Sequence, residues 1–202
     1  MHFTIISYIE IITLFVAIIF LKKKNNGLLF SILVLNATAE TLFSINNNLI
    51  GCVVLYCYLH FILWFLLFFK KIEEERFLQY IIPSFTFFCI VDFFYWEGTK
   101  SLNNYSFVLG TFIYVISFIL FSFKFLKQEK FSWLLSNNYL LLISPILFFL
   151  GHSFMFAFDS QSLYYTKLFK NINLYPIVSY FVSIIYYSLI NLYIYKENKS
   201  HV

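Results

Sequence analysis

Residues 49–71 read LIGCVVLYCYLHFILWFLLFFKK, and this stretch decides the fold class. From Leu49 to Phe69 the chain carries no Asp, Glu, Lys or Arg, and two lysines then follow at once. The hydrocarbon core of a bilayer is about 30 Å thick, and an α-helix needs roughly 20 apolar residues to cross it. The stretch therefore predicts a transmembrane helix that ends at a polar boundary.

The composition of the whole chain carries the same signal. Hydrophobic residues make up 61% of the 202 residues, charged residues only 12%, and the mean hydropathy is +0.79. A typical soluble domain has about twice that share of charged residues. The composition therefore predicts an all-α, polytopic membrane protein and excludes a soluble globular fold.

Seven apolar runs of roughly this length follow one another along the chain. They cover Phe3–Leu21, Leu28–Ile45, Leu49–Phe69, Phe77–Trp96, Phe107–Leu126, Leu134–Phe158 and Leu174–Tyr195. The first run lacks the basic start and the small-residue cleavage site of a signal peptide, so we expect it to be retained. The connections are short, and we expect residues 1–202 to form a single seven-span membrane domain with no soluble domain.

The basic residues predict the orientation, because lysine and arginine near span ends are retained on the cytoplasmic side. Eleven of them fall at one set of span ends and three at the other. The eleven are Lys22, Lys23, Lys24, Lys70, Lys71, Arg76, Lys124, Lys127, Lys130, Lys196 and Lys199, and the three are Lys100, Lys167 and Lys170. We expect a multi-pass protein of the cell inner membrane with its N-terminus outside and its C-terminus inside.

The charge distribution and the cysteine positions argue against two properties, namely nucleic-acid binding and extracytoplasmic disulfide bonds. The net charge of +4 comes from lysines dispersed over several membrane-flanking sites, so direct nucleic-acid binding is not expected. Cys52, Cys57 and Cys89 fall within predicted spans, which excludes an extracytoplasmic disulfide framework.

Ionisable groups inside the predicted spans are the first candidates for a site, since a charge in hydrocarbon costs roughly 2.5 to 3.5 kcal/mol on insertion scales. At about 1.5 Å per residue, four of them lie roughly 6 to 10 Å below the outer boundary. The four are Glu10, Glu40, Asp92 and His152. Together with Asn36, which shares a helical face with Glu40, they predict a polar pocket that opens outward.

A fifth ionisable group, His60, lies near the middle of the third predicted span. Tyr56 and Trp64 are four residues away on either side and share its helical face. For Glu40 and His60 the alternative is a structural role as an interhelical hydrogen-bonding partner, and for Glu10 and Asp92 it is a tolerated, water-exposed position near the membrane interface. At Ser144-Pro145 we expect a kink whose freed carbonyl is satisfied by neighbouring groups.

The residues argue against several enzymatic and cofactor-binding classes. The spans contain no HxxxH or HExxH pair for zinc and no GxSxG for a nucleophilic serine, and the five glycines form no phosphate-binding loop. The last span contains no lysine for a retinal Schiff base, and no histidine stands five residues after Arg76 as an RxxxxH ribonuclease motif requires. We expect no catalytic residue, no metal and no cofactor.

The segments NNNLIGCVVLYCYLHFILWFLLFFKK (46–71) and NLYPIVSYFVSIIYYSLINLYIYKENK (173–199) resemble the small multi-pass membrane proteins of Bacteroidetes. In size and character the chain is similar to the membrane accessory proteins of type VI-B CRISPR loci. One accessory type there enhances the RNA-targeting nuclease and carries an RxxxxH motif, and the other represses it. Since this chain lacks the motif, the resemblance implies the repressing type, although seven spans exceed the number usual in that group.

Three functional hypotheses follow. In the first, the chain is a non-enzymatic membrane accessory protein that modulates a cytoplasmic antiviral effector, such as an RNA-guided nuclease, through its basic loops. The loop residues concerned are Lys70, Lys71, Arg76, Lys124, Lys127 and Lys130. In the second, it is a seven-helix receptor or sensor subunit that binds a small ligand in the outward pocket. In the third, it is a pore or proton-linked transporter with a relay through His60, formed within one chain or between copies in an oligomer.

Overall fold

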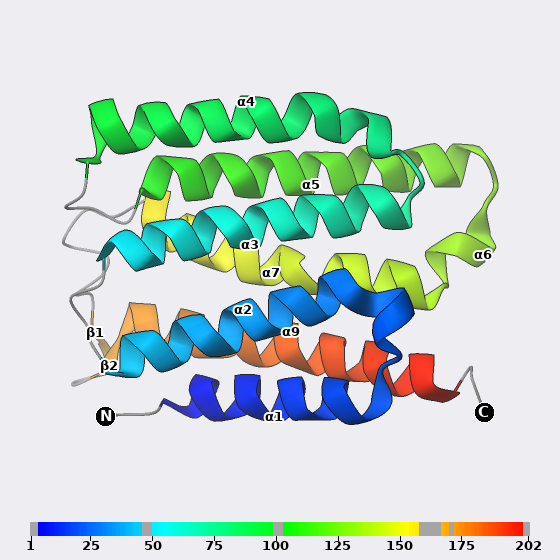
Figure 1. Ribbon diagram of the computed structural model, residues 1–202, viewed down its shortest axis with the longest axis horizontal. Helices are drawn as coiled ribbons and strands as arrows, with labels where there is room; N and C mark the ends of the chain where they lie inside the picture. The colour runs from blue at the N-terminus through cyan, green and yellow to red at the C-terminus, as the bar shows by residue number, and fades with distance from the viewer. Residues whose placement is uncertain (1–3, 46–49, 99–102, 158–166, 170–171, 200–202) are drawn as a thin grey trace. The chain divides into compact units, whose positions relative to one another are not determined.

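The structure is a computed structural model, and it describes residues 4–45, 50–98, 103–157, 167–169 and 172–199. These residues are almost wholly helical (Figure 1). The short antiparallel pair of β1, Lys167–Phe169, with β2, Ile172–Asn173, is the exception within the described residues. The prediction of an all-α fold is confirmed at this level.

Six helical segments are long and apolar enough to cross a membrane. They are Asn25–Ile45 in α2 (Lys23–Ile45), Gly51–Lys71 in α3 (Ile50–Lys71), Glu75–Trp96, Asn104–Lys127 (α5), Asn137–Ala157 (α7) and Leu174–Lys199 (α9). The segment Glu75–Trp96 contains η1 (Glu75–Phe77), α4 (Leu78–Val91) and the π-helical η2 (Asp92–Trp96). Each of the six falls where the apolar pattern predicts a span.

The first predicted span forms a shorter helix, α1, which covers Ile5–Phe20. Its 16 residues extend about 24 Å, which is less than the thickness of the hydrocarbon core. A smaller difference concerns the sixth run, where a one-turn helix, α6 (Phe131–Leu134), precedes α7. The predicted span ends Phe3, Leu49 and Phe158, and the basic residues Lys100 and Lys170, lie outside the described residues.

The chain divides into two compact units, residues 1–110 and residues 111–202, and the boundary falls within α5. In the first unit α1 packs against α2, α2 against α3, and α3 against α4. These helices alternate in direction along the chain (Figure 1). In the second unit the principal packing is between α7 and α9.

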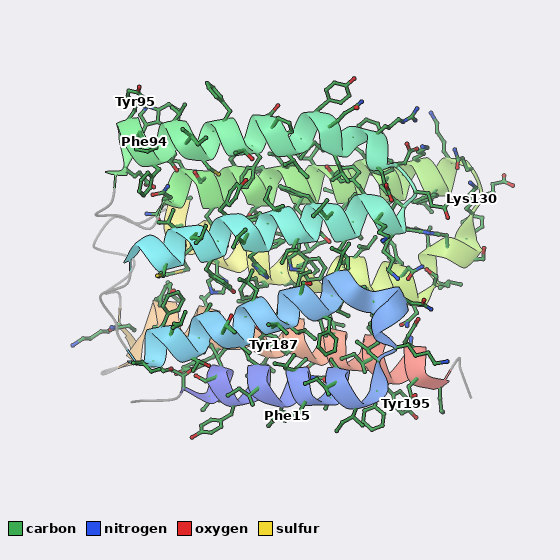
Figure 2. The ribbon with its side chains drawn as sticks, in the orientation of Figure 1. Phe15, Phe94, Tyr95, Lys130, Tyr187 and Tyr195 are labelled. Carbon is green, nitrogen blue, oxygen red and sulfur yellow. The ribbon has the colours of Figure 1, made fainter. Side chains whose placement is uncertain are left out.

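The helix α1 places polar and small residues inside and large apolar residues outside. The buried face of α1 consists of Ser7, Glu10, Thr13 and Ala17, whereas Phe15 is 59% exposed. Figure 2 shows Phe15 directed away from the helices. In water this arrangement would be unfavourable, but lipid solvates the outer apolar face and the inner face supplies hydrogen-bonding groups. The pattern is that of a membrane-embedded bundle.

An aromatic cluster fills the centre of the first unit. The ring of Phe61 lies 5.1 Å from that of Phe107 and 5.7 Å from that of Phe85, in edge-to-face arrangements that aromatic rings favour. Gly110 makes room for this cluster, because a Cβ there would come within 2.9 Å of the Phe61 ring. The close approach of α5 to α3 within this unit therefore depends on that glycine.

In the second unit the proline of α7 is accommodated by hydroxyl groups. Pro145 has no N–H to donate to the carbonyl of Leu141. The Ser144 hydroxyl donates to that carbonyl at 2.7 Å, and the Tyr114 hydroxyl donates to the carbonyl of Leu142 at 2.8 Å. The prediction that neighbouring groups satisfy the carbonyl freed by the proline is confirmed.

The contact between α7 and α9 generates a prediction about stability. A Cβ at Gly151 would lie 2.6 Å from Cγ1 of Val182, a β-branched side chain with little rotamer freedom. Gly151→Ala should therefore lower the free energy of unfolding by about 1 to 3 kcal/mol, as overpacking does. Thermal unfolding of the purified protein in detergent measures this effect.

Two further variants make that measurement specific. Gly51→Ala is the matched control, since nothing lies within 4 Å of a Cβ at that position, and it should not lower stability. Adding Val182→Ala to Gly151→Ala should restore most of the loss. An unchanged melting temperature for Gly151→Ala would contradict the close packing of α7 on α9.

Candidate functional site

Glu40 of α2 lies against the beginning of α1. Its Oε1 accepts a hydrogen bond from the Ser7 hydroxyl at 2.6 Å and another from the Thr4 hydroxyl at 3.2 Å. Thr4 is the N-cap of α1, and Thr4 and Ser7 form a reciprocal capping box. A carboxylate near the N-terminus of a helix also interacts favourably with the helix dipole. Glu40 thus joins α2 to the first turn of α1.

A second polar group links α2 and α3 through a half-buried tyrosine and two buried aromatic residues. The Tyr56 hydroxyl donates to Oδ1 of Asn36 at 3.2 Å, and the Tyr56 ring stacks on His60 with centroids 5.4 Å apart. Trp64 donates its indole N–H to Nε2 of His60 at 3.1 Å. We call these four residues, Asn36, Tyr56, His60 and Trp64, the aromatic polar seam.

The tryptophan contact determines how His60 is protonated. An indole N–H is a donor only, so Nε2 of His60 must be an acceptor and the ring is the neutral tautomer with hydrogen on Nδ1. His60 is 1% exposed and Trp64 is fully buried. This contact occupies the nitrogen lone pair that a proton relay through Nε2 would use. The predicted grouping of Tyr56, His60 and Trp64 on one face of α3 is confirmed.

Asp92, at the start of η2, holds the beginning of α5. Its Oδ2 accepts from the backbone N–H of Ser106 at 2.9 Å and from the Ser106 hydroxyl at 2.5 Å. The first amides of a helix have no partner within the helix, and an acidic side chain that accepts from them stabilises its N-terminus. Asp92 is fully buried. Its contacts are those of a helix-capping carboxylate.

His152 lies in the second unit, on α7. Its Nδ1 is 2.9 Å from the carbonyl of Phe148, and its Nε2 is 3.3 Å from the hydroxyl of Ser179 on α9. Since a carbonyl only accepts, Nδ1 carries the hydrogen and Nε2 accepts from Ser179. The next residue, Ser153, donates to the hydroxyl of Thr111 on α5 at 2.6 Å. These bonds join three helices of the second unit.

The five residues of the predicted outward pocket therefore contact different helices in different parts of the structure. Glu40 of α2 contacts the start of α1, and Glu10 is buried on the same α1 face as Ser7. Asn36 belongs to the aromatic polar seam with His60, Asp92 caps α5, and His152 belongs to the other unit. A single pocket that contains all five stays a prediction.

The described residues contain no group of three or more His, Cys, Asp or Glu side chains that could hold a metal ion. A groove of about 590 Å³ lies between α2 and α3, and apolar side chains dominate its lining. Its lining does not include the residues of the predicted outward pocket. The chemistry that the intramembrane residues support is hydrogen bonding between helices.

The two candidate basic contact stretches differ in charge. Between Lys70 and Arg76 the chain carries three basic and three acidic residues, and Arg76 forms an ion pair with Glu74 at 3.0 Å. Between Lys124 and Lys130 it carries three lysines and one glutamate. We call residues 124–130 the basic stretch. Both Lys127 and Lys130 are exposed, and Figure 2 shows Lys130 at the turn that follows α5.

Aromatic contacts hold the basic stretch against the following helix. The ring of Trp133 stacks on Phe125 with centroids 4.1 Å apart and meets Tyr139 of α7 at 5.5 Å. The ammonium group of Lys130 lies 5.9 Å from the centre of the Phe125 ring. The end of α5 and its lysines are therefore presented on an ordered turn.

Several hydrogen-bonding partners were not singled out from the sequence. They are Thr4, Ser7, Ser106 and Ser179. The spacing of Thr4 and Ser7 before an apolar run is the one local signal for a helix start. Ser106 and Ser179 meet their partners only through packing.

No family model, curated protein or solved structure matches this chain.

The contacts of Glu40 generate the second prediction. Glu40→Leu removes the acceptor for two hydroxyl groups at the start of α1, so the first turn of α1 should lose about 1 to 3 kcal/mol of local stability. Hydrogen–deuterium exchange of the protein in lipid nanodiscs measures this loss at residues 5–9. Glu40→Gln keeps a side-chain oxygen acceptor and should exchange nearly as slowly as the wild type. Unchanged exchange in Glu40→Leu would contradict the assigned role.

Proposed function

We propose that the chain is a seven-span protein of the cell inner membrane, with its N-terminus outside and its C-terminus inside. Six segments meet the length and hydropathy of spans, and α1 supplies the seventh. The inner polar face and outer apolar face of α1 favour this assignment. A helix somewhat shorter than the bilayer core is accommodated by local thinning of the bilayer. The excess of lysines at one set of helix ends supports the orientation.

Within that membrane protein we propose a non-enzymatic accessory role, in which the chain represses a cytoplasmic effector protein. The observation that carries this proposal is the basic stretch, which combines exposed lysines, a net positive charge and an aromatic support. An exposed patch of one charge sign accelerates association with a partner of opposite charge. The partner surface is accordingly an acidic one on a protein.

The contacts inside the membrane support the same assignment. Glu40, Asp92 and His152 are engaged in hydrogen bonds that begin or join helices. A structural role of this kind is the commonest use of polar residues between membrane helices. The groups left for contact with a soluble partner are those at the helix ends.

The resemblance to the membrane accessory proteins of type VI-B CRISPR loci suggests which effector to test first. An RNA-guided, RNA-targeting nuclease would be held or inhibited at the membrane surface by protein contacts. The chain itself would bind no nucleic acid.

A charge-removal variant tests the basic stretch. In cells that express such a nuclease with a matching target, Lys124→Gln, Lys127→Gln and Lys130→Gln combined should abolish repression, because the acidic surface loses its partner. The measured quantity is the survival of the targeted transcript or phage. Membrane insertion and abundance of the variant should be unchanged.

Two matched variants complete the test. The triple replacement of the same lysines by arginine keeps the charge and should preserve repression. The triple replacement of Lys70, Lys71 and Arg76 by glutamine removes the same number of basic residues from a stretch that is neutral overall, and should have the smaller effect. If the variant with glutamine in place of Lys124, Lys127 and Lys130 still represses the nuclease fully, the proposal is contradicted.

A further inference from the structure

An open groove of about 590 Å³ runs along the outside of the α2–α3 pair. Its wall on α2 is formed by Gly27, Ser31, Val34 and Thr38, and its wall on α3 includes Leu59 and Leu63. The α2 residues recur at intervals of three and four, so they share one helical face. Figure 1 shows α2 and α3 side by side over the length concerned.

The groove presents an apolar surface despite its two hydroxyl-bearing residues. The Ser31 hydroxyl donates to the carbonyl of Gly27 at 3.1 Å, and the Thr38 hydroxyl donates to the carbonyl of Leu35 at 3.0 Å. Both donors are therefore used within α2, and the groove offers a ligand mainly hydrocarbon contacts. Such a surface suits an alkyl chain better than a polar solute.

The length of the groove matches one leaflet of a bilayer. From Gly27 to Thr38 it extends eleven residues, or about 17 Å along α2, which is roughly half of the hydrocarbon core. A transmembrane helix of another chain would need a surface that runs through the whole core. The groove dimensions therefore favour a single acyl chain from one leaflet over a partner helix.

Basic residues stand at one end of the groove. Lys70 follows Leu63 by seven residues, which places both on the same face of α3, and Lys70 is exposed. Lys22, also exposed, precedes Gly27 by five residues in the turn between α1 and α2. Lysines at a membrane surface attract the phosphate of anionic lipids, and basic sites between membrane helices bind their headgroups.

We infer that this groove is a binding site for an anionic phospholipid of the leaflet at the basic end of the helices. One acyl chain lies between α2 and α3, along Ser31, Val34 and Leu63. The phosphate lies between the ammonium groups of Lys22 and Lys70. The site requires only that these helices cross the bilayer, and it is independent of the proposed effector.

A groove-filling variant tests the acyl-chain position. The full chain is reconstituted in vesicles of equal parts phosphatidylglycerol and phosphatidylethanolamine, extracted in mild detergent, and analysed by native mass spectrometry for retained lipid. The wild type should retain one phosphatidylglycerol. Gly27→Leu should lose it, because the new side chain enters the groove, where nothing lies within 4 Å of a Cβ at this position.

Gly51→Leu is the matched control. It makes the same replacement at another helical glycine with open space around it, in a separate groove between α3 and α4, and should retain the lipid as the wild type does. Equal retention by Gly27→Leu and the wild type would overturn the site. A dimer of the chain that Gly27→Leu dissociates, with no retained lipid in the wild type, would overturn it as well.

Replacement of the two lysines tests the headgroup position. Lys22→Gln with Lys70→Gln should lower the preference for phosphatidylglycerol over phosphatidylethanolamine at least about tenfold, as the loss of two lysine–phosphate attractions implies. The corresponding arginine pair should keep the preference. If the variant with both glutamines keeps the wild-type preference for phosphatidylglycerol, the two lysines do not hold the phosphate. That result would overturn the assignment of an anionic lipid to the groove.

Discussion

Hydrocarbon offers no hydrogen bonds, and this constraint accounts for many of the hydrogen bonds that the structure contains. Every backbone and side-chain polar group inside the bilayer must find its partner within the protein. Several serine and threonine hydroxyls donate to carbonyls of their own helices, as Ser44 does to Glu40 and Thr86 does to Ile82. The side chains of Glu40, Asp92 and His152 instead take partners on other helices, and so they help to determine which helices lie together.

The same constraint explains the distribution of residue types on α1, which is the reverse of that on a helix of a water-soluble protein. The inner face of α1 is made of Ser7, Glu10, Thr13 and Ala17, while large apolar side chains face outward. Small residues let helices approach, and buried polar residues then hold them at defined positions. With those groups used for assembly, the charged helix ends and the lipid-facing grooves are where we propose that the protein meets other molecules.

The sequence predicted the helices well because hydropathy and length follow directly from the thickness of a bilayer. Positions on one helix were also predictable: spacing alone placed Tyr56, His60 and Trp64 on one face, and the structure adds the bond from Trp64 to His60. Partners on different helices were not predictable. Residue spacing gives the depth of Glu40 or Asp92 along its helix, but it does not give the rotation of the helix or the identity of its neighbours. Ser7 and Ser106 are 33 and 14 residues away from the carboxylates that they meet.

The central claim is a membrane-spanning bundle that presents its basic stretch to the cytoplasm. Single-cysteine labelling in intact cells tests it most directly, with Cys52, Cys57 and Cys89 first replaced by serine. Under the account, a membrane-impermeant maleimide labels Lys167→Cys in intact cells and labels Lys127→Cys only after lysis. Labelling of Lys127→Cys in intact cells, or protection of Lys167→Cys until lysis, would contradict the orientation and the accessory function that depends on it.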